Sequence, residues 1–577
     1  MSLDPIVLAL VQNRLDHISR QMGWIMTRTA HSPIFSQAHD FSCFLTDADG
    51  MLVSTADGIP IHTGGGGFAV RAVLKAFAGR INDGDVYLLS DPYTAGGNHL
   101  PDWVIARPVF TEAELTGFAC NRAHQSDIGG GAAGTYNADA TEIYHEGIRL
   151  PVLKLIEVDK VRDDLWQLLL LNSRTPDLMD GDLHAMIGST RIGAERISAL
   201  IEELGLEEGR AYLEGILSHA DRVFRAAISE LPDGRYEAEA VTDNDCFERI
   251  DYTVRVALTI SGDRLTVDFT GTDPQMKGFK NSSVANTFSA VCMALVSFLG
   301  PDIPRNEGTF RGVEIIMPEG TLVNALPPAA MTMNTVYVAY DIIHAIWKAL
   351  SEADPSRSCA GWGKNVHPGT AGGIGSNRPF VTYHWNAMAG AGAAGERDGF
   401  NQIGLLVTLG GLTLPDIEVY EQLYPVRYLR SEFRCDTGGP GEWRGGTGVD
   451  YEAEVEVASE YSFRGEGLYT PSGYGIDGGG WGEAGSMEIF PKEGEPIDPP
   501  QFGVRTYGPL RLKISSPGGG GRGRPFERDP ERVLRDVRDG VVSDAAAAET
   551  YGVVINGDGT SINIEATQKR RSEATHA

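Results

Sequence analysis

The sequence predicts a multi-domain protein of mixed α/β (α+β) class, with a helical and mixed-sheet N-terminal part and a β-rich C-terminal part. Apolar residues follow helical spacing over residues 5–29 and 181–231, and they alternate with polar residues over 252–269. Residues 432–489 show strand patterns separated by glycine turns. A chain of 577 residues is also too long for one hydrophobic core. We therefore expect several domains.

The N-terminal part is expected to begin with a helix over residues 5–29, which the pair Asp4-Pro5 initiates. A hairpin over 41–53 follows, with its turn at Asp47–Gly50. Further strands are predicted over 85–90, 104–110 and 115–119, and further helices over 65–77, 163–172, 181–204 and 208–231.

The hydrophobic period changes from helical to alternating near residue 233, which predicts a domain boundary there. The expected division is residues 1–232 for an N-terminal domain that holds a metal site, 233–430 for a central α/β domain and 431–567 for a β-rich domain. A charged tail, 568–577, is expected to be disordered. Later expectations are helices over 285–299, 336–353 and 525–542, and a glycine-rich loop over 369–399 that packs over a site or an interface.

The composition excludes some classes of function. The net charge of -29 repels phosphate backbones, which argues against a nucleic-acid partner. The six cysteines are scattered and form no CxxC pair, so we expect buried free thiols rather than a disulfide framework. Met1–Arg14 lacks the pattern of a secretory signal, and no apolar run is long enough to span a bilayer. The expected location is the cytoplasm.

The polar segments 91–102 and 122–131 carry the clearest sign of a functional site. They place histidines and carboxylates in turns beside predicted strands, where sites commonly lie. His99 and Asp102 are three residues apart and His124 follows the next strand, so the three could converge on one metal ion; Asp40 is a fourth candidate. The alternative is that both imidazoles are turn residues bonded to nearby backbone.

Other polar residues allow two interpretations. Asp127 and Glu146 could act as general bases or could orient the ligating imidazoles, or they could simply be exposed. His39 and His62 are similarly ambiguous. The glycine runs 64–67 and 518–521 match neither GxxxxGK[ST] nor GxGxxG after a strand, and no GxSxG is present. We therefore expect this chain not to bind ATP.

The chain resembles the hydantoinase B/oxoprolinase family from residue 32 to residue 554. The resemblance rests on ordered blocks that include Ser32-Pro-Ile-Phe-Ser-Gln-Ala-His-Asp-Phe-Ser42, His99-Leu-Pro-Asp102 and Thr437-Gly-Gly-Pro-Gly-Glu-Trp-Arg-Gly-Gly-Thr-Gly448. The other blocks are 84–93, 123–130, 414–421, 516–521, 527–540 and 551–554.

The resemblance implies a metal-containing subunit that works with a partner. The family comprises ATP-dependent ring-opening amidases (5-oxoprolinase, N-methylhydantoinase, caprolactamase) and the related acetone and acetophenone carboxylases. An actin-like A-type partner is implied to bind ATP and Mg, while the B-type chain holds a divalent transition metal, Zn or Mn, in an assembly expected to be (αβ)2. By family motif, the ligands fall on Asp40, His99, Asp102 and His124.

The leading hypothesis is a B-type subunit of an ATP-dependent hydrolase of lactams, hydantoins or 5-oxoproline-type rings. The partner would activate the ring carbonyl with ATP, metal-bound water would attack it, and Asp127 or Glu146 could shuttle the proton. Gln37, where relatives often have Glu, favours an amidase weakly. The alternatives are a subunit of an acetone- or acetophenone-type ketone carboxylase and a non-catalytic scaffold.

We expect residues 369–400 with Trp362 and Trp385 to supply either a contact surface for the partner or part of this chain's own core.

Overall fold

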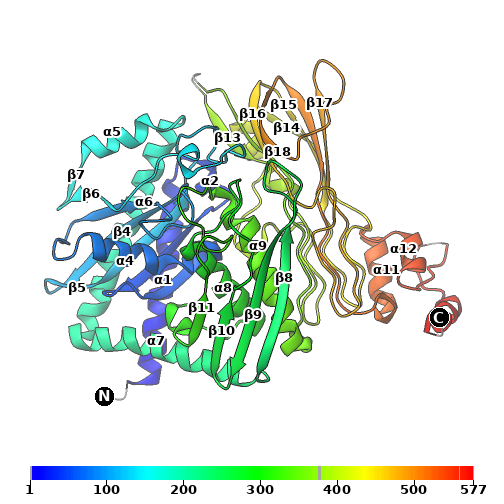
Figure 1. The fold of residues 1–577 in the computed structure, drawn as a ribbon, viewed down its shortest axis with the longest axis horizontal. Coiled ribbons are helices and arrows are strands. Elements are labelled where there is room, and N and C mark those ends of the chain that lie inside the picture. The colour runs from blue at the N-terminus through cyan, green and yellow to red at the C-terminus, as the bar shows by residue number, and fades with distance from the viewer. Residues whose placement is uncertain (1–2, 375–377, 558, 576–577) are drawn as a thin grey trace. The chain divides into compact units, whose positions relative to one another are not determined.

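The computed structural model describes residues 3–374, 378–557 and 559–575 (Figure 1). The chain forms two compact units. The first comprises Met1–Ala349, Gly373–Val381 and Val407–Thr413, and the second comprises Leu350–Gly372, Thr382–Leu406 and Leu414–Ala577. Both contain helices and sheets, which confirms the predicted mixed α+β class. The finer boundaries at residues 232 and 430 stay predictions.

A seven-stranded antiparallel sheet forms the centre of the first unit, in the order β2–β1–β5–β4–β3–β6–β7. The predicted hairpin is confirmed as its β1–β2 pair. The strands are β1 Phe41–Asp47, β2 Leu52–Gly58, β3 Val86–Leu89, β4 Asp102–Thr111, β5 Glu114–His124, β6 Leu153–Glu157 and β7 Lys160–Val161.

The predicted helices of this unit are also present. The first begins at Pro5 because the Asp4 carboxylate caps it, accepting a 2.8 Å hydrogen bond from the Ile6 amide. The helices are α1 Pro5–Thr29, α2 Pro33–Ser36, α3 Pro60–Thr63, α4 Gly66–Ala76, α5 Asp163–Leu171, α6 Pro176–Leu204, α7 Leu206–Ser229, α8 Val284–Leu299 and α9 Tyr337–Ala353, the last of which begins in this unit. Among the described residues, no helix has the length and apolar character needed to cross a membrane.

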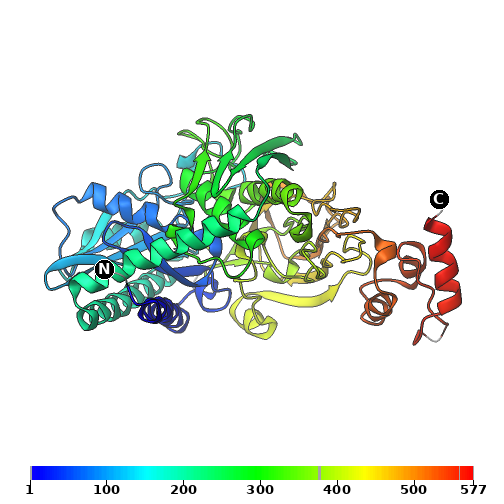
Figure 2. The ribbon, with the colours of Figure 1, turned by 90° about the horizontal axis from the view of Figure 1, so that it is seen from below.

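Side chains that alternate along the central strands pack against helices on opposite faces of the sheet. Phe44 and Val104 belong to a buried cluster with Ala69 of α4. On the other face, the Asn121 amide donates a 2.8 Å hydrogen bond to the Met186 carbonyl of α6. Figure 2 shows α1 and α4 on opposite sides of this sheet. The period of two in each strand therefore fixes which residues meet α4.

The glycine run 64–67 allows α3 and the start of α4 to approach α8 closely. A Cβ on Gly65 would lie 2.8 Å from the Ala285 carbonyl oxygen, and one on Gly64 would lie 2.7 Å from the Ser289 Cα. The Gly65 amide donates a 2.6 Å hydrogen bond to Ser289 Oγ. Packing thus accounts for these glycines, and the same packing positions the short helix that carries His62.

A second sheet of the first unit has the order β11–β10–β9–β8, with the β10–β11 pair parallel. Its strands confirm the alternating pattern predicted after residue 233. They are β8 Gly234–Thr242, β9 Tyr252–Ser261, β10 Arg264–Asp268 and β11 Val313–Ile316.

The second unit is rich in strands, as the sequence predicts. One sheet has the order β14–β15–β19–β17, and β12, β16 and β18 belong to a sheet with the order β13–β12–β16–β18. The bounds are β12 Gly369–Gly372, β13 Phe380–Tyr383, β14 Val426–Phe433, β15 Val449–Val455, β16 Ser459–Arg464, β17 Ser486–Pro491, β18 Phe502–Tyr507 and β19 Leu510–Ser515.

Five glycine-rich segments of the second unit pack backbone against backbone. We call them the glycine layer: residues 360–363, 390–393, 437–446, 473–482 and 516–521. Hydrogen bonds join the segments, for example from the Gly519 amide to the Gly446 carbonyl (2.9 Å) and from the Gly520 amide to the Gly361 carbonyl (2.8 Å). A Cβ on Gly519 would lie 2.0 Å from the Ala391 carbonyl oxygen. Residues 518–521 are therefore glycine because no side chain fits between the segments.

Two expectations for the second half of the chain are wrong, and the structure decides between the two alternatives given for Trp385. Residues 369–399 include strands β12 and β13 rather than forming only a loop. Trp385 is 6% exposed, and its ring centre lies 5.0 Å from that of Tyr383, so of the two alternatives it belongs to this chain's own core; Trp362 is half-buried. The described part of the tail, residues 568–575, is helical, because α13 spans Ile564–Thr575.

The predicted helix over 525–542 is shorter than expected. A 3-10 turn occupies Pro525–Glu527, and α11 begins at Pro530, capped by Asp529, and ends at Arg538. Proline fixes the backbone of a first helical turn but cannot continue a helix that has already begun, so Pro530 sets the start of α11. Helix α12 follows at Asp544–Glu549, and both helices contribute to a small core around Tyr551.

Substitution of a glycine-layer residue is predicted to destabilise the second unit. Gly519→Ala should lower the free energy of unfolding by about 3 kcal/mol or more, because the added methyl group overlaps the Ala391 backbone. Gly508→Ala is the matched control, since a Cβ at that position would have no atom within 4 Å. Denaturant unfolding of both variants measures the difference, and equal stability would contradict the packing argument.

Candidate metal centre

The register of two neighbouring strands brings the first pair of predicted ligands together. Asp102 is the first residue of β4, His124 is the last residue of β5, and the two face each other as cross-strand partners. Directly opposed residues in an antiparallel pair have Cβ atoms about 4.5–5.5 Å apart. The predicted strand stopped at Ala119, whereas β5 continues to His124, so this ligand lies within the sheet rather than beyond it.

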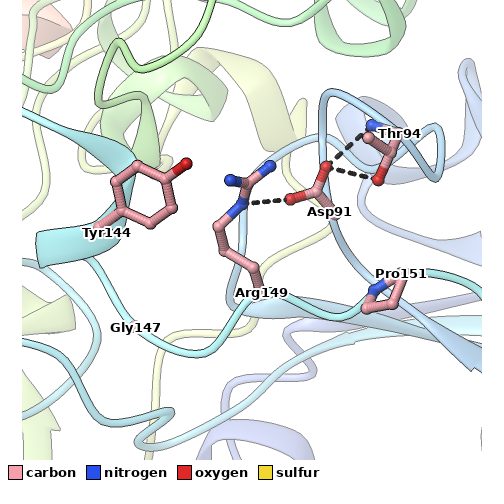
Figure 3. A pocket seen from close by; sticks show the side chains of 6 residues that line it. All are labelled: Asp91, Thr94, Tyr144, Gly147, Arg149 and Pro151. Carbon is pink, nitrogen blue, oxygen red and sulfur yellow. Dashed lines mark hydrogen bonds and ion pairs between the residues drawn. The ribbon is translucent and has the colours of Figure 1, made fainter.

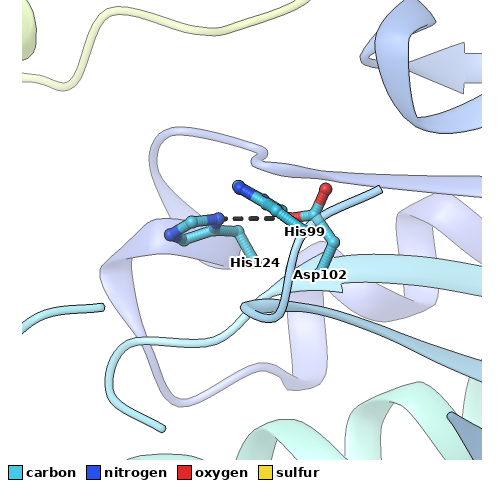
Figure 4. Close-up of side chains that lie close together, drawn as sticks. All are labelled: His99, Asp102 and His124. Carbon is cyan, nitrogen blue, oxygen red and sulfur yellow. Dashed lines mark hydrogen bonds and ion pairs between the residues drawn. The ribbon is translucent and has the colours of Figure 1, made fainter. Parts of the chain in front are cut away.

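Three of the four predicted ligands converge (Figure 4). Asp102 Oδ1 lies 2.7 Å from His99 Nε2 and 3.1 Å from His124 Nδ1. One potential ligand atom from each of the three side chains lies within 4.8 Å of the others, and all three side chains are buried. Two imidazoles and a carboxylate are ligands that Zn, Mn and Fe accept.

The tautomer of His99 indicates that a cation belongs at this point. The Thr332 carbonyl oxygen lies 2.6 Å from His99 Nδ1, so Nδ1 carries the proton and donates it. In a neutral imidazole, the lone pair of Nε2 then faces the Asp102 carboxylate. His99 Nε2 and Asp102 Oδ2 are both buried without a hydrogen-bond partner. His99 Nε2 and Asp102 Oδ1 face each other at 2.7 Å, and two such acceptors need a proton or a metal ion between them, so these residues fit a divalent metal.

The electrostatics of Asp102 are unusual for a buried carboxyl group. Burial alone raises its pKa, but His62, His99 and His124 together outweigh burial and hold the pKa well below its ordinary value. Asp102 is thus an anion in a site from which water is excluded. Metal ligation requires the ionised carboxylate, and these neighbours maintain it.

Asp40, the fourth predicted ligand, lies beside this group, and His62 faces both carboxylates. His62 Nε2 is 3.2 Å from Asp102 Oδ2 and 3.6 Å from Asp40 Oδ1. His62 is 3% exposed, and burial lowers its pKa while the two carboxylates partly offset that effect. The Asp40 carbonyl also accepts a 3.1 Å hydrogen bond from the His124 amide.

His62 is therefore the site residue whose role the sequence left undecided. It comes from α3, 37 residues before His99, and no spacing motif connects the two. The signal that could have distinguished it from His39 is the glycine run directly after it, which holds α3 against α8. By contrast, the Nδ1 atom of His39 lies 3.1 Å from Thr413 Oγ1.

Arg122 fixes the two loops that carry His62 and His99. Its Nη1 donates to the His62 carbonyl (2.6 Å) and to Asn98 Oδ1 (2.7 Å), the residue before His99. The side chain is fully buried, and burial lowers its pKa to about 10. Even so, it remains a cation at neutral pH, close to the anionic centre.

Asp127 anchors the loop that covers His124. Its Oδ1 accepts from the Gly129 and Arg174 amides, and its Oδ2 accepts from the Gly134 amide and pairs with the Arg174 guanidinium at 3.2 Å. The loop it holds ends at Thr135, whose Oγ1 is 3.1 Å from His124 Nε2. These contacts give Asp127 a positioning function.

Glu146 supports His99 from the opposite side. Its two oxygens accept hydrogen bonds from the amides of Met331 (2.9 Å) and Thr332 (2.6 Å). The Thr332 carbonyl oxygen in turn accepts a hydrogen bond from His99 Nδ1. Burial raises the pKa of Glu146 to about 7, so this carboxyl group can hold a proton near neutral pH. Asp127 and Glu146 each reach the centre through a loop rather than by direct contact, and their predicted role as proton shuttles stays a prediction.

The fold and this buried site define an α+β protein with a centre suited to a divalent metal. The family model for hydantoinase B/oxoprolinase matches residues 4–525. The chain belongs to this family.

Two relatives extend the likeness over nearly the whole chain. The beta subunit of caprolactamase from Pseudomonas jessenii is 34% identical, covering 97% of each chain. A protein of Pseudomonas sp. (strain NS671), described as the B subunit of a D-/L-hydantoinase, is 32% identical over 99% of this chain and 98% of its own.

Solved structures agree with these relatives. The crystal structure of the ATP-dependent caprolactamase from Pseudomonas jessenii matches with a TM-score of 0.89 and 32% identity, covering 99% of this chain and 100% of that one. A nucleotide-free structure of an acetone carboxylase matches with a TM-score of 0.88 and 21% identity, covering 99% of this chain and 83% of that one. At this lower identity, the likeness shows the fold alone.

The geometry predicts that the purified protein loses its metal when either imidazole is removed. His99→Ala and His124→Ala should each reduce bound transition metal from about one equivalent to near zero, because the remaining ligands no longer surround the ion. Elemental analysis of the dialysed protein measures it. His184→Ala, which alters an exposed histidine on α6, is the control. Full occupancy in both ligand variants would disprove the site.

A second prediction separates His62 from His39. His62→Ala should weaken metal affinity about 10–100-fold, as is typical when a group that orients ligands is lost. His39→Asn should leave it unchanged; asparagine tolerates the positive φ of 57° found at this position. Competition with a chelator gives both affinities. If the two variants bound metal equally well, His62 would have no part in the centre.

Proposed function

We propose that this chain is the metal-binding B-type subunit of an ATP-dependent hydrolase of cyclic amides, such as lactams, hydantoins or 5-oxoproline-type rings. The observation that carries the proposal is the buried His99–Asp102–His124 group, in which His99 Nε2 and His124 Nδ1 both face Asp102 Oδ1. Support comes from relatives named as the beta subunit of a caprolactamase and the B subunit of a hydantoinase, each matched over nearly its full length. Both names describe subunits, so we propose an A-type partner and an (αβ)2 assembly.

The residues of the centre prepare it for attack on an activated carbonyl. Asp102 provides a permanent negative charge, and the imidazoles of His99 and His124 turn one nitrogen each toward it. Burial of these side chains excludes bulk water, which would otherwise hydrolyse an activated intermediate unproductively. A divalent metal bound there would supply a Lewis acid and lower the pKa of a bound water to about 7.

Two carboxyl groups around the centre, those of Glu146 and Asp127, differ in how well they suit proton transfer. Glu146, with a pKa of about 7, can hold or release a proton near neutral pH, and its hydrogen bond to Thr332 connects it to His99. Asp127 is bonded to Arg174 and three amides, which hold its carboxylate in one orientation and leave it engaged with the loop. We therefore propose Glu146 as the better candidate for a proton shuttle and Asp127 as a positioning residue.

We propose that the partner subunit binds the ATP that activates the ring carbonyl. An unstrained amide is a poor electrophile, so its carbonyl must be activated before attack. The two glycine runs that could suggest a phosphate loop, 64–67 and 518–521, are packed against other segments of this chain. This packing supports the proposal that ATP and Mg are bound by the A-type partner.

The proposal predicts that ring opening needs both chains. This chain, coexpressed with its A-type partner, should convert ATP and a lactam, hydantoin or 5-oxoproline to the open-chain product, and the His99→Ala complex should retain less than about 1% of that rate, because one metal ligand is lost. Chromatographic detection of product and phosphate measures it. The isolated chain should neither bind nor hydrolyse ATP, which calorimetry tests.

Two outcomes would reject the proposal. Consumption of acetone and bicarbonate, with no turnover of any ring amide, would indicate a ketone carboxylase. A monomeric chain that is fully active without a partner, shown by size exclusion with light scattering, would exclude the heteromeric mechanism.

A further inference from the structure

A cavity of about 380 Å³ lies in the first unit, apart from the metal centre. None of the four predicted ligands lines it. Figure 3 shows the side chains around it, with Arg149 in the middle. The lining residues are Asp91, Thr94, Tyr144, Gly147, Arg149 and Pro151. A volume of this size is typical of a site for a small molecule.

The guanidinium of Arg149 is held in one orientation. Its Nε donates a 2.6 Å hydrogen bond to Asp91 Oδ2. Asp91 is itself fixed, because its Oδ1 accepts from the Tyr93 amide and from the amide and hydroxyl of Thr94. The Arg149 guanidinium carbon also lies 5.2 Å from the ring centre of Tyr144 and 5.9 Å from that of Tyr93. Little side-chain entropy therefore remains to be lost when a ligand binds.

Among the residues that the structure describes, Asp91 is the one carboxylate bound to this guanidinium, at its Nε edge. Figure 3 shows the two terminal nitrogens of Arg149 pointing away from its backbone, beyond the bond to Asp91 and toward the side of the Tyr144 hydroxyl. About 24% of the Arg149 side chain is exposed, so solutes can reach it. Two parallel N–H groups at this edge match the two oxygens of a carboxylate.

The same chain shows that one arginine can hold two carboxylates. Arg528 binds Asp536 Oδ2 through Nε (3.1 Å) and Nη2 (2.8 Å). Its terminal edge binds both oxygens of Asp398, through Nη1 (2.7 Å) and Nη2 (2.8 Å). Asp91 binds the Nε side of Arg149, as Asp536 binds the Nε side of Arg528. The position that Asp398 takes on Arg528 corresponds, on Arg149, to the terminal edge beside the Tyr144 hydroxyl, which interacts with the guanidinium but leaves this edge without a carboxylate from the described residues.

We propose that this cavity binds the carboxylate of a small organic acid at the terminal edge of Arg149. Asp91 fixes the arginine, while the exposed ring of Tyr144 and the ring of Pro151 provide apolar surface for the carbon chain of the ligand. Glu146, which supports His99 through Thr332, lies in the chain between the lining residues Tyr144 and Gly147. The inference does not depend on the proposed hydrolase activity.

Calorimetric titration of the full-length protein with glutarate tests the proposal, with the uncharged diamide glutaramide and inorganic phosphate as comparison probes. Glutarate should bind one site with a dissociation constant on the order of 1 mM. Glutaramide should not bind because it carries no negative charge. Phosphate should bind at least several-fold more weakly, because it lacks the carbon chain that contacts Tyr144 and Pro151.

Variants locate the binding. Arg149→Met should weaken glutarate binding at least tenfold, and Arg149→Lys, which keeps the charge beside Asp91 but loses the paired donors, should weaken it several-fold. Arg162→Met is the matched control and should bind normally, since Arg162 is also bonded to a carboxylate, Asp164, but lines a different cavity. Circular dichroism checks the fold, and if Arg149→Met is unfolded, Arg149→Lys decides. Unchanged affinity in the folded variants, tighter binding of phosphate, or no glutarate binding at about 50 mM would overturn the proposal.

Discussion

The candidate metal centre depends on a single cross-strand pair, Asp102 at the start of β4 and His124 at the end of β5. A buried carboxylate is costly unless charged or hydrogen-bonded groups surround it. Here the surrounding groups are imidazoles delivered by different parts of the first unit: His62 from α3, His99 from the turn before β4 and His124 from the neighbouring strand. The sheet register sets the pair, and the rest of the unit brings the remaining groups to it.

Those remaining groups arrive because loops are tied by buried polar contacts. Arg122 holds the backbone near His62 and Asn98, Glu146 holds Thr332 behind His99, and Asp127 holds the loop that leads to Thr135. Each of these residues lies close in sequence to one element and contacts another that is far away. Removing one would leave a buried partner unsatisfied, which costs more than the net strength of the bond. The chemistry of the centre is therefore inseparable from the packing of its loops.

The sequence predicted the parts of this arrangement that are local. Apolar spacing located α1, α6 and α7, alternation located β9 and β10, and the position of His99, Asp102 and His124 beside predicted strands indicated their convergence. His62 could not be assigned in this way, since its proximity to Asp102 arises from the packing of α3 on α8. The tail was mispredicted for a related reason. Charged composition suggested disorder, but Arg571 donates to the Tyr551 and Arg528 carbonyls, contacts that composition does not encode.

The glycine layer constrains the order in which the second unit can form. Its central segment, residues 516–521, bonds to segments that begin more than a hundred residues earlier, such as the Gly361 carbonyl with the Gly520 amide. During synthesis, residues near Gly361 leave the ribosome well before Gly520. Until Gly520 is made, the backbone groups that will bond to it are hydrogen-bonded to water. Contacts of such long sequence separation form slowly and leave partly folded chains open to aggregation. Residues 516–521, which are synthesised after the other four segments, thus complete the glycine layer. A chain that ends before them would lack the centre of the layer.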